Sequence, residues 1–176
     1  RKSRKLKEAP YLTDMIEKFN QRTYWVASLV LKCTDITLRV NLIKYFIHIA
    51  IKAKELNNFY LLFSITTALG LQPLYRLKED WSTIGSTLTD KLDKLKELNN
   101  PASNYKNYRK VYTSSIGKAM IPHLAITTKD CFQLEEIETF DEITGNVNFS
   151  KFVKQYTILS EFLQCQQANA ILKYDQ

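Results

Sequence analysis

The sequence predicts an all-α fold, a single compact multi-helix domain. Only four Gly and four Pro occur among 176 residues, and so few chain-breaking residues favour long helices over a β-sandwich with many turns. Apolar residues recur at helical spacing along most of the chain, whereas strand-like alternation is scarce. The apolar content of 45% is typical of a soluble globular protein, and the length suits one buried core. We therefore expect about eight helices.

The first helices are predicted from apolar stripes and a capping pair. Apolar residues repeat at helical spacing within residues 12–19 and again within 25–33, which indicates two successive helical segments. Thr34 and Asp35 can cap a new helix start. The apolar face that follows, from Ile36 to about Ala53, is the longest of the three, so we expect this helix to be central.

A break near residue 57 separates this helix from the next. Asn57 and Asn58 interrupt the apolar pattern, and we interpret both as structural residues that bond the turn between two helices. A further apolar helix is predicted from Phe59 to Leu69. Gly70 stands where a C′ glycine ends a helix, and Pro73 confirms the break.

The second half of the chain predicts two more helices and then a helical hairpin. A leucine stripe runs through residues 88–98, and another helix begins near Tyr105. Two longer helices are expected over about residues 127–138 and 149–167, on either side of a polar loop that contains Gly145. This arrangement predicts a hairpin that protrudes from the domain.

Basic residues are concentrated at the N-terminus. We divide the chain into a basic extension, residues 1–10, and one helical domain, residues 11–176, whose hairpin spans about residues 127–167. The net charge is +7, but the rest of the chain is only mildly basic, which argues against nucleic-acid binding as the main role. The extension can contact a membrane surface, an acidic partner or only solvent. Its basic residues are Arg1, Lys2, Arg4, Lys5 and Lys7.

No local motif for covalent chemistry, a cofactor or a metal occurs in the sequence. His48 and His123 are the only histidines, and His48 lies in an apolar helix, where a buried histidine is expected. Glycine-rich phosphate loops, HExxH and GxSxG are absent. Cys33, Cys131 and Cys165 show no CxxC spacing, so we expect reduced thiols in the core of a cytoplasmic protein. We predict no cofactor, no metal site and no enzymatic chemistry.

A series of short segments forms an ordered pattern along the chain. They are Ile16-Glu17-Lys18-Phe19-Asn20, Glu55-Leu56-Asn57-Asn58-Phe59, Pro73-Leu74-Tyr75-Arg76-Leu77, Trp81, Asn104-Tyr105-Lys106-Asn107-Tyr108-Arg109, Ile121-Pro122-His123-Leu124, Lys129-Asp130 with Glu135-Glu136, and Asn148-Phe149-Ser150-Lys151. Their order and spacing resemble the catalytic domain of Ras-family guanine-nucleotide exchange factors, the group that includes Sos. The resemblance covers about residues 11–168, without the helices that usually precede them in that family.

The resemblance implies an exchange factor that promotes GDP release from a Ras-family small GTPase by inserting the hairpin beside the nucleotide site. Phe132 and Glu136 correspond to the residues that act there. Their spacing of four would place both on one helix face, whereas periodicity alone would make Phe132 a core residue and Glu136 a solvated charge. Recruitment to a membrane from the cytoplasm, or delivery by a bacterium into a host cytosol, stays open.

The same resemblance implies which residues contact the GTPase, although burial is the alternative for the aromatic ones. Two departures affect the hairpin. The family's Gly-Asn after the hairpin glutamate is replaced by Ile137-Glu138, and the basic pair after Lys151 is replaced by Phe152-Val153. We therefore expect either a different lock or a looser hairpin. The alternative function is a helical GTPase- or protein-binding module of the same fold without exchange activity. The implied contact residues are Tyr75, Asn104, Tyr105, His123 and Lys129.

Overall fold

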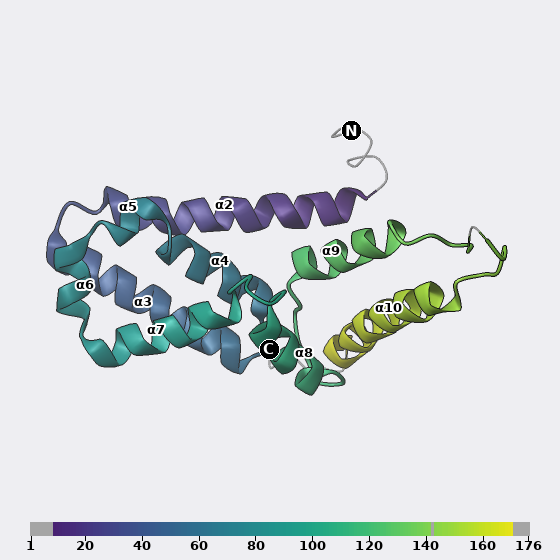
Figure 1. Cartoon of the computed structure of the whole chain (residues 1–176). Coiled ribbons are helices and arrows are strands. Elements are labelled where there is room, and N and C mark those ends of the chain that lie inside the picture. The colour runs from purple at the N-terminus through teal and green to yellow at the C-terminus, as the bar shows by residue number, and fades with distance from the viewer. Residues whose placement is uncertain (1–8, 142, 171–176) are drawn as a thin grey trace.

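Nine α-helices make up the regular structure of residues 9–141 and 143–170, the part of the chain that this computed structural model describes. No β-strand occurs within these ranges, where the β-type pairings are two isolated bridges. The predicted all-α fold is confirmed (Figure 1). The helices are α2 (Pro10–Lys32), α3 (Ile36–Glu55), α4 (Phe59–Leu69), α5 (Gln72–Tyr75), α6 (Lys78–Ile84), α7 (Ser86–Leu98), α8 (Lys106–Ser115), α9 (Leu124–Glu135) and α10 (Phe149–Ala170).

The first helix is continuous where the sequence predicts two segments. α2 has 23 residues and starts at Pro10, whose missing N–H suits the first turn of a helix. Thr23 near its middle is buried. The Thr23 hydroxyl donates to the Phe19 carbonyl at 2.9 Å and lies 3.3 Å from the Ser64 carbonyl of α4. Packing against α4 therefore stabilises the helical conformation of the polar stretch between the two apolar stripes.

Two side-chain caps set the next helix boundaries, as predicted. The Asp35 carboxylate accepts a hydrogen bond from the Leu38 N–H at 2.8 Å at the start of α3. The Asn58 side chain accepts from the Leu61 N–H at 3.0 Å at the start of α4. Asn57 adopts a φ of 53°, a left-handed conformation that asparagine tolerates better than most residues. Both asparagines therefore shape the turn between α3 and α4.

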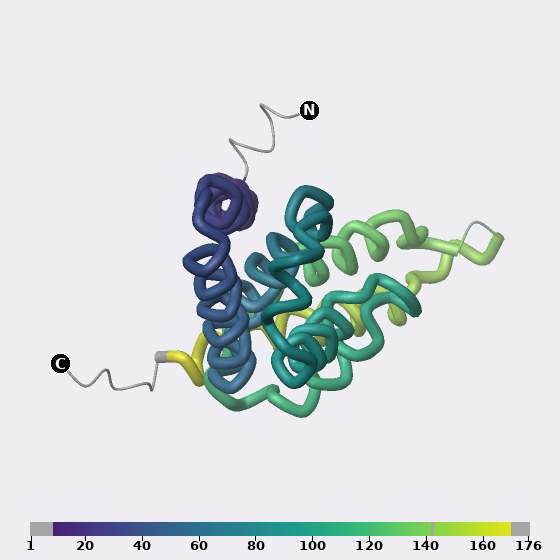
Figure 2. The backbone as a smooth tube through the Cα atoms, turned by 90° about the vertical axis from the view of Figure 1, so that its left-hand side faces the viewer, coloured from purple at the N-terminus to yellow at the C-terminus, as the bar shows by residue number. Residues whose placement is uncertain are grey.

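α4 lies at the centre of the helical body and packs against α2, α3, α5 and α7 (Figure 2). Eight of its 11 residues are buried, and Phe59, Leu62 and Phe63 are fully enclosed. α3, the helix that the sequence predicts to be central, shares this role, since it packs against α2, α4, α6 and α7. The apolar core between these helices is the main source of stability of the body.

α5 and α6 are short helices that the sequence does not predict, because four and seven residues are too few to show helical periodicity. One contact joins the two short helices to each other, and a second holds α6 against the body. The Trp81 Nε1–H donates to the Leu74 carbonyl at 2.8 Å. Arg39 of α3 donates through Nη2 to Asp80 Oδ1 at 3.0 Å and through Nε to Asp80 Oδ2 at 3.1 Å. Asp80 is only 1% exposed, so this ion pair ties α6 firmly to α3.

α9 and α10 form a hairpin that extends away from the helical body in both views (Figure 1, Figure 2). The protruding hairpin predicted from the sequence is thus confirmed. The first arm, α9, lies a few residues earlier than the predicted range of about 127–138, because the helix begins directly after the turn at Pro122 and His123. The second arm, α10, runs past its predicted end near Gln167 to Ala170.

Three expectations about single residues are corrected. Gly70 ends α4 with a φ of −93°, so it is not a left-handed C′ glycine, and its lack of a side chain instead avoids a close approach to the preceding turn. His48 is exposed, because it lies on the face of α3 that points away from the core. Cys165 is buried as predicted, whereas Cys33 and Cys131 are only partly buried; all three are free thiols.

The predicted basic extension lies almost entirely outside the described residues, since Arg1–Lys7 falls in the part of the chain that the structure does not describe. α2 begins at Pro10, the last residue of that extension. Within residues 9–141 and 143–170, no helix combines the length and the apolar character needed to cross a membrane.

Truncating the central leucine of α4 should destabilise the protein strongly. Leu62 is fully buried, so Leu62→Ala leaves a cavity, and we expect the free energy of unfolding to fall by about 2–5 kcal/mol. Leu159→Ala is the matched control, because Leu159 is 59% exposed on α10 and its truncation should change that free energy by less than about 0.5 kcal/mol. Urea denaturation followed by circular dichroism measures both, and equal losses would contradict the central position of α4.

Candidate functional site

The base of the hairpin is a short extended segment whose backbone is hydrogen-bonded on two sides. On one side, the Ile121 N–H donates to the Asn57 carbonyl at 3.0 Å, and the Phe59 N–H donates to the Ile121 carbonyl at 2.9 Å. On the other side, the Met120 N–H donates to Asn169 Oδ1 at 2.9 Å, and the Asn169 amide donates to the Met120 carbonyl at 2.7 Å. The hairpin base is therefore fixed both to the α3–α4 turn and to the end of α10.

A buried lysine locks the far end of the hairpin. The Lys151 ammonium donates to the Ile137 carbonyl at 2.6 Å and to the Thr139 hydroxyl at 3.0 Å, and Lys151 is only 9% exposed. Ile137 follows the C-terminus of α9, where unpaired carbonyls and the helix dipole favour a positive charge. These contacts hold the far end of the hairpin at the place where residues 137–138 and 152–153 depart from the family pattern. Lys151 itself lies in a segment that resembles the family, so the expectation of a different lock stays a prediction.

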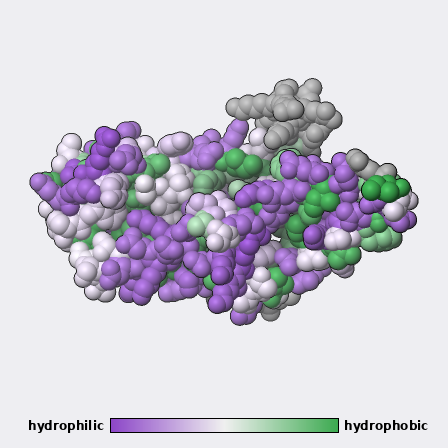
Figure 3. Space-filling model, viewed as in Figure 1, coloured by the Kyte–Doolittle hydropathy of each residue, from purple (hydrophilic) through white to green (hydrophobic). Residues whose placement is uncertain are grey.

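The loop between the two arms folds around Asp141. Its carboxylate accepts hydrogen bonds from the Thr144 N–H at 2.7 Å, the Thr144 hydroxyl at 2.9 Å and the Ile143 N–H at 3.1 Å. These donors, first among them the Thr144 N–H, lower the pKa of Asp141. Apolar residues gather at this free end (Figure 3), where Phe140 is 58% exposed and Ile143 is 94% exposed. Polar contacts thus hold a loop that presents apolar groups.

Phe132 and Glu136 are both exposed on the first arm. Phe132 is 54% exposed, so it is not the core residue that periodicity alone would make it. Glu136 directly follows α9, and its φ of −72° and ψ of −13° continue the right-handed turn. The spacing of four residues therefore keeps both side chains on one face. We call Phe132 and Glu136 the arm pair; its catalytic role stays a prediction.

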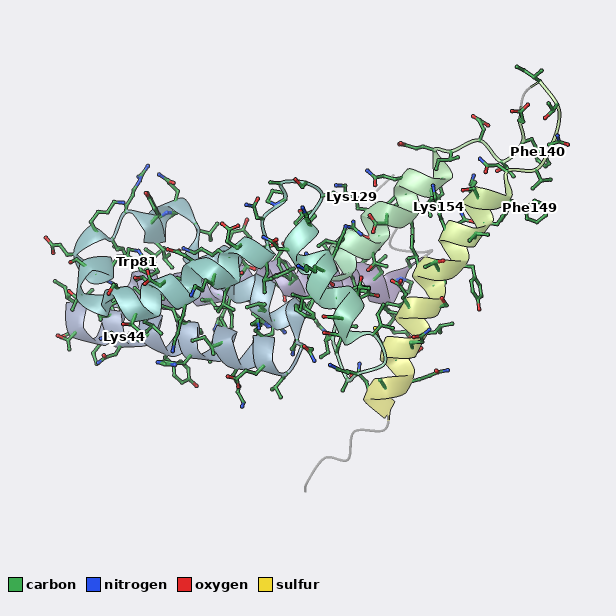
Figure 4. The ribbon with its side chains drawn as sticks, turned by 60° about the horizontal axis from the view of Figure 1, so that its bottom comes forward. Lys44, Trp81, Lys129, Phe140, Phe149 and Lys154 are labelled. Carbon is green, nitrogen blue, oxygen red and sulfur yellow. The ribbon has the colours of Figure 1, made fainter. Side chains whose placement is uncertain are left out.

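Three of the predicted GTPase-contact residues lie together where α9 meets the segment before α8. The Lys129 ammonium donates to Asn104 Oδ1 at 3.2 Å, and it lies 5.8 Å from the centre of the Tyr105 ring, within the range of a cation–π contact. Asn104 and Lys129 are exposed, whereas Tyr105 is half-buried and packs against the core. Figure 4 shows Lys129 on the first arm. We call Asn104, Tyr105 and Lys129 the contact cluster.

The backbone turn at residues 103–105, which carries two members of the contact cluster, is strained. Ser103, Asn104 and Tyr105 have φ values of 51°, 55° and 58°, and each left-handed residue other than glycine costs about 1–2 kcal/mol. The Arg109 Nε–H holds this turn by donating to the Asn104 carbonyl at 2.8 Å. The same guanidinium forms a two-pronged pair with Asp130 of α9, in which the Nη1–Oδ2 and Nη2–Oδ1 distances are both 2.7 Å.

Tyr75, the fourth predicted contact residue, lies on a different part of the body. It ends α5, which packs against α2 and α4, and its side chain is 57% exposed. The Lys78 ammonium lies 3.7 Å from the centre of the Tyr75 ring and restricts its orientation through a cation–π contact. The place of Tyr75 in one surface with the contact cluster stays a prediction.

His123, the fifth predicted contact residue, is packed mainly inside the body. The centre of its ring lies 5.2 Å from that of Phe19 and 5.0 Å from that of Phe63, and its backbone N–H donates to the Tyr108 hydroxyl at 3.0 Å. The Nδ1 atom is buried, and it has no hydrogen-bond partner among the described residues. Burial lowers the pKa of His123 to about 4. Its contact with a GTPase stays a prediction.

Arg109 and Asp130 lie in segments of the ordered sequence pattern, but neither they nor Lys78 was predicted to act at the site. Arg109 and Asp130 are 21 positions apart, and neither periodicity nor a local motif can pair residues at that separation. Lys78 follows Tyr75 at helical spacing, but a lysine at such a position is usually a solvated charge. Their contacts become visible only once α6, α8 and α9 are placed in space.

The site combines exposed aromatic, carboxylate and ammonium groups. The arm pair presents one apolar and one anionic side chain, and the contact cluster can both donate and accept hydrogen bonds. Such a mixture suits contact with a protein surface. Among the residues that the structure describes, no group of three or more His, Cys, Asp or Glu side chains is placed to hold a metal ion.

Comparison with known proteins assigns the chain to a family. The family model described as the RasGEF domain matches residues 1–153, which include the contact cluster and the arm pair. The chain belongs to the RasGEF domain family. This RasGEF domain is 33% identical over 160 residues to Ras guanine nucleotide exchange factor R of Dictyostelium discoideum. It is also 30% identical over 167 residues to Cell division control protein 25 of Saccharomyces cerevisiae, and 34% identical over 133 residues to Rap guanine nucleotide exchange factor 6 of Homo sapiens.

These matches cover most of this RasGEF domain and a small part of each relative. They span 91%, 94% and 75% of this chain in the same order. They span only 9%, 10% and 8% of the three relatives, so the chain corresponds to about a tenth of their length. The resemblance drawn from the sequence motifs is confirmed at the level of the family.

Protonation of His123 should destabilise the fold in acid. The folded-state pKa of about 4 lies below the value of about 6.5 for an unfolded histidine, so the unfolded state takes up the proton first as the pH falls. The contribution of the neutral His123 side chain to the free energy of unfolding is complete above about pH 6.5, and it decreases by about 2–3 kcal/mol as the pH falls to about 4.5. His123→Phe, which keeps an aromatic ring, should lack this decrease.

Urea denaturation at about pH 7 and about pH 4.5 measures the effect as a difference between variants. His48→Gln is the matched control, because His48 is exposed and its removal should leave the acid-dependent loss intact. If His123→Phe loses as much stability as the unaltered protein between these pH values, a different group is responsible.

Removing the Lys151 ammonium should loosen the far end of the hairpin. Lys151→Met keeps a side chain of similar length but removes charge-assisted hydrogen bonds, each of which contributes about 1.5–3 kcal/mol to stability. Hydrogen exchange at the Asn148 N–H, which donates to the Thr139 carbonyl at 2.8 Å, should become faster by at least about tenfold. Lys154→Met removes an exposed ammonium of α10 (Figure 4) and should leave that exchange rate unchanged. An unchanged rate in Lys151→Met would refute the lock.

Proposed function

We propose that this RasGEF domain promotes the release of guanine nucleotide from a Ras-family small GTPase, without covalent chemistry. The observation that carries the proposal is the arm pair, whose two side chains are exposed at the end of the first arm of a projecting hairpin. Family membership supports it, as do the names of the relatives, which describe Ras and Rap guanine nucleotide exchange factors. We propose the cytoplasm as the place of action. The proposal does not extend to a membrane contact, because Arg1–Lys7 lies outside the described residues.

The proposed action lowers the barrier to nucleotide release and need not supply the whole binding free energy. A nucleotide held at picomolar affinity is bound by about 16 kcal/mol. An acceleration of about 10⁴–10⁵ requires only about 5.5–7 kcal/mol of transition-state stabilisation. A few contacts made during release can supply this amount, because one charge-assisted hydrogen bond contributes about 1.5–3 kcal/mol.

In the proposed mechanism, the two members of the arm pair act on different parts of the nucleotide site. Phe132 would occupy the space of the magnesium ion beside the nucleotide, and its ring has no oxygen to replace the ligands that the ion requires. The Glu136 carboxylate would compete with phosphate for the hydroxyl and ammonium donors of the GTPase. Both effects weaken nucleotide binding while the GTPase stays attached to the exchange factor.

The contact cluster and Tyr75 would hold the GTPase during release. They offer aromatic, amide and ammonium groups, and exposed aromatic residues in particular are enriched at the centres of protein interfaces. The cation–π contact with Lys78 keeps the Tyr75 ring in one orientation and so reduces the entropy lost on binding. Lys151 and Asn169 fix the two ends of the hairpin, so the arm pair keeps its place while the GTPase binds.

A helical binding module without exchange activity is the alternative. The changed residues 137–138 and 152–153 are the reason for it, and the Lys151 contacts at the same end of the hairpin weaken that reason. The deciding experiment measures release of a fluorescent GDP analogue from a panel of Ras-family GTPases, with and without the protein. Acceleration with at least one GTPase supports exchange, whereas complex formation without acceleration supports the alternative.

Two substitutions should separate the arm pair from the binding surface. Glu136→Ala should slow release at saturating exchange factor by about 10–150-fold, since one charge-assisted hydrogen bond is lost, and should leave the affinity for the nucleotide-free GTPase largely unchanged. Tyr75→Ala should instead weaken complex formation itself, because it removes an interface anchor. Stopped-flow release at saturation and a titration of the nucleotide-free GTPase distinguish the two effects.

Both substitutions have matched controls. Glu135→Ala removes a neighbouring exposed carboxylate that points in a different direction from α9, and Tyr45→Ala removes a tyrosine that is 61% exposed on α3. Neither control should change the release rate or the affinity by more than about twofold. An unchanged saturating rate for Glu136→Ala would remove the carboxylate from the mechanism and leave steric displacement by Phe132.

A further inference from the structure

One guanidinium joins the contact cluster to the hairpin arm. Arg109 lies near the start of α8. Its Nε–H donates to the Asn104 carbonyl, and its two Nη groups donate to the carboxylate of Asp130. On α9, Asp130 directly follows Lys129 of the contact cluster and precedes Phe132 of the arm pair by two positions. A single side chain therefore contacts elements of both halves of the proposed site.

The left-handed turn beneath the contact cluster depends on these contacts. Three successive residues, 103–105, have positive φ, a conformation that residues other than glycine adopt unfavourably. The Tyr105 carbonyl accepts the Arg109 backbone N–H at 3.0 Å, and the Asn104 carbonyl accepts the Arg109 Nε–H at 2.8 Å. The Asn104 side chain is held from α9 by Lys129. The turn thus keeps its conformation while α8 and α9 stay docked.

The geometry of the pair is specific to arginine. A planar guanidinium can donate two parallel hydrogen bonds to one carboxylate and a further bond from Nε. The Arg109 and Asp130 side chains are 35% and 19% exposed, so solvent screens their attraction only in part. A lysine at position 109 would keep the positive charge, but its single nitrogen could not hold the Asn104 carbonyl and both Asp130 oxygens in this fork.

We propose that Arg109 is a positioning residue that couples GTPase binding at the contact cluster to the action of the arm pair. The inference rests on the proposed exchange function and deepens it. The pair between Arg109 and Asp130 fixes the left-handed turn against α9, so a GTPase bound at the contact cluster also sets the position of the arm pair. Without the pair, the turn and the arm move separately, and binding no longer places the arm pair in the nucleotide site.

A double-mutant cycle measures this coupling. Tyr105→Ala alters the contact cluster, Glu136→Ala alters the arm pair, and the nucleotide-release efficiency is measured for each change alone and for both together. In the unaltered background, the combined effect should differ from the product of the single effects by more than about twofold. In an Arg109→Lys background, the combined effect should equal the product of the two single effects to within about 1.5-fold. Asp130→Asn, which keeps the shape of the side chain, should abolish the coupling in the same way.

Arg39→Lys is the matched control. Arg39 makes the same kind of two-pronged pair with Asp80, but between α3 and α6 in the body, away from the hairpin. Arg39→Lys and Arg109→Lys both keep the positive charge and lose the fork, and thermal unfolding reports the stability of each. Arg39→Lys should retain the coupling between Tyr105 and Glu136, and Arg109→Lys should lose it. A purely structural Arg109 would lower the melting temperature and leave the coupling intact.

The outcomes separate this inference from the proposed function. If the unaltered protein accelerates release and the coupling persists in Arg109→Lys and Asp130→Asn, the positioning role is overturned and the exchange function stands. If the combined effect of Tyr105→Ala and Glu136→Ala in the unaltered protein equals the product of the single effects, the two sites are not coupled and the positioning role is overturned as well. If no GTPase in the panel releases nucleotide faster, the exchange function is overturned and the inference falls with it. Loss of coupling in both variants, with coupling retained in Arg39→Lys, supports the positioning role.

Discussion

The hairpin owes its position to the extended segment 120–123, whose backbone groups are bonded to three other parts of the chain. A buried backbone N–H or carbonyl without a partner costs about 1–3 kcal/mol, so this segment can be enclosed only where suitable partners converge. Such a place exists where the α3–α4 turn, α8 and the end of α10 meet. The direction of α9, and with it the location of every arm residue, follows from that junction. The partner residues are Asn57, Phe59, Tyr108 and Asn169.

The body and the hairpin are stabilised by different kinds of interaction. Apolar burial around α4 dominates in the body, and this contribution is largely non-directional. In the hairpin, where α9 packs against α10 and Leu134 is buried, directional contacts are added, namely those of the Lys151 ammonium at its far end and of the pair between Arg109 and Asp130 near the body. Hydrogen bonds and fork-shaped ion pairs lose strength steeply with misalignment. Directional contacts thus position the exposed site residues, whereas the apolar core of the body supplies most of the folding free energy.

Helices with clear periodicity and side-chain caps could be predicted from the sequence, and α4 was predicted with its observed bounds. Short helices could not, and neither could the burial of Lys151, a charged residue near the start of α10. Motif order named the residues of the contact cluster and of the arm pair, whose roles stay predictions, but it could not pair Arg109 with Asp130, because that contact depends on the docking of two helices. The apolar residues that are exposed on α10 are Phe149, Phe152, Val153, Tyr156, Leu159 and Leu163.

Three successive left-handed residues beneath the contact cluster also impose an order on folding. In the unfolded chain, residues 103–105 favour extended and right-handed conformations, so the turn forms only when its partners are already present. Those partners, Arg109 and Lys129, belong to helices that must first form and dock. The surface proposed to meet the GTPase is therefore completed late as the chain folds, and it is among the first parts to open when α8 and α9 separate.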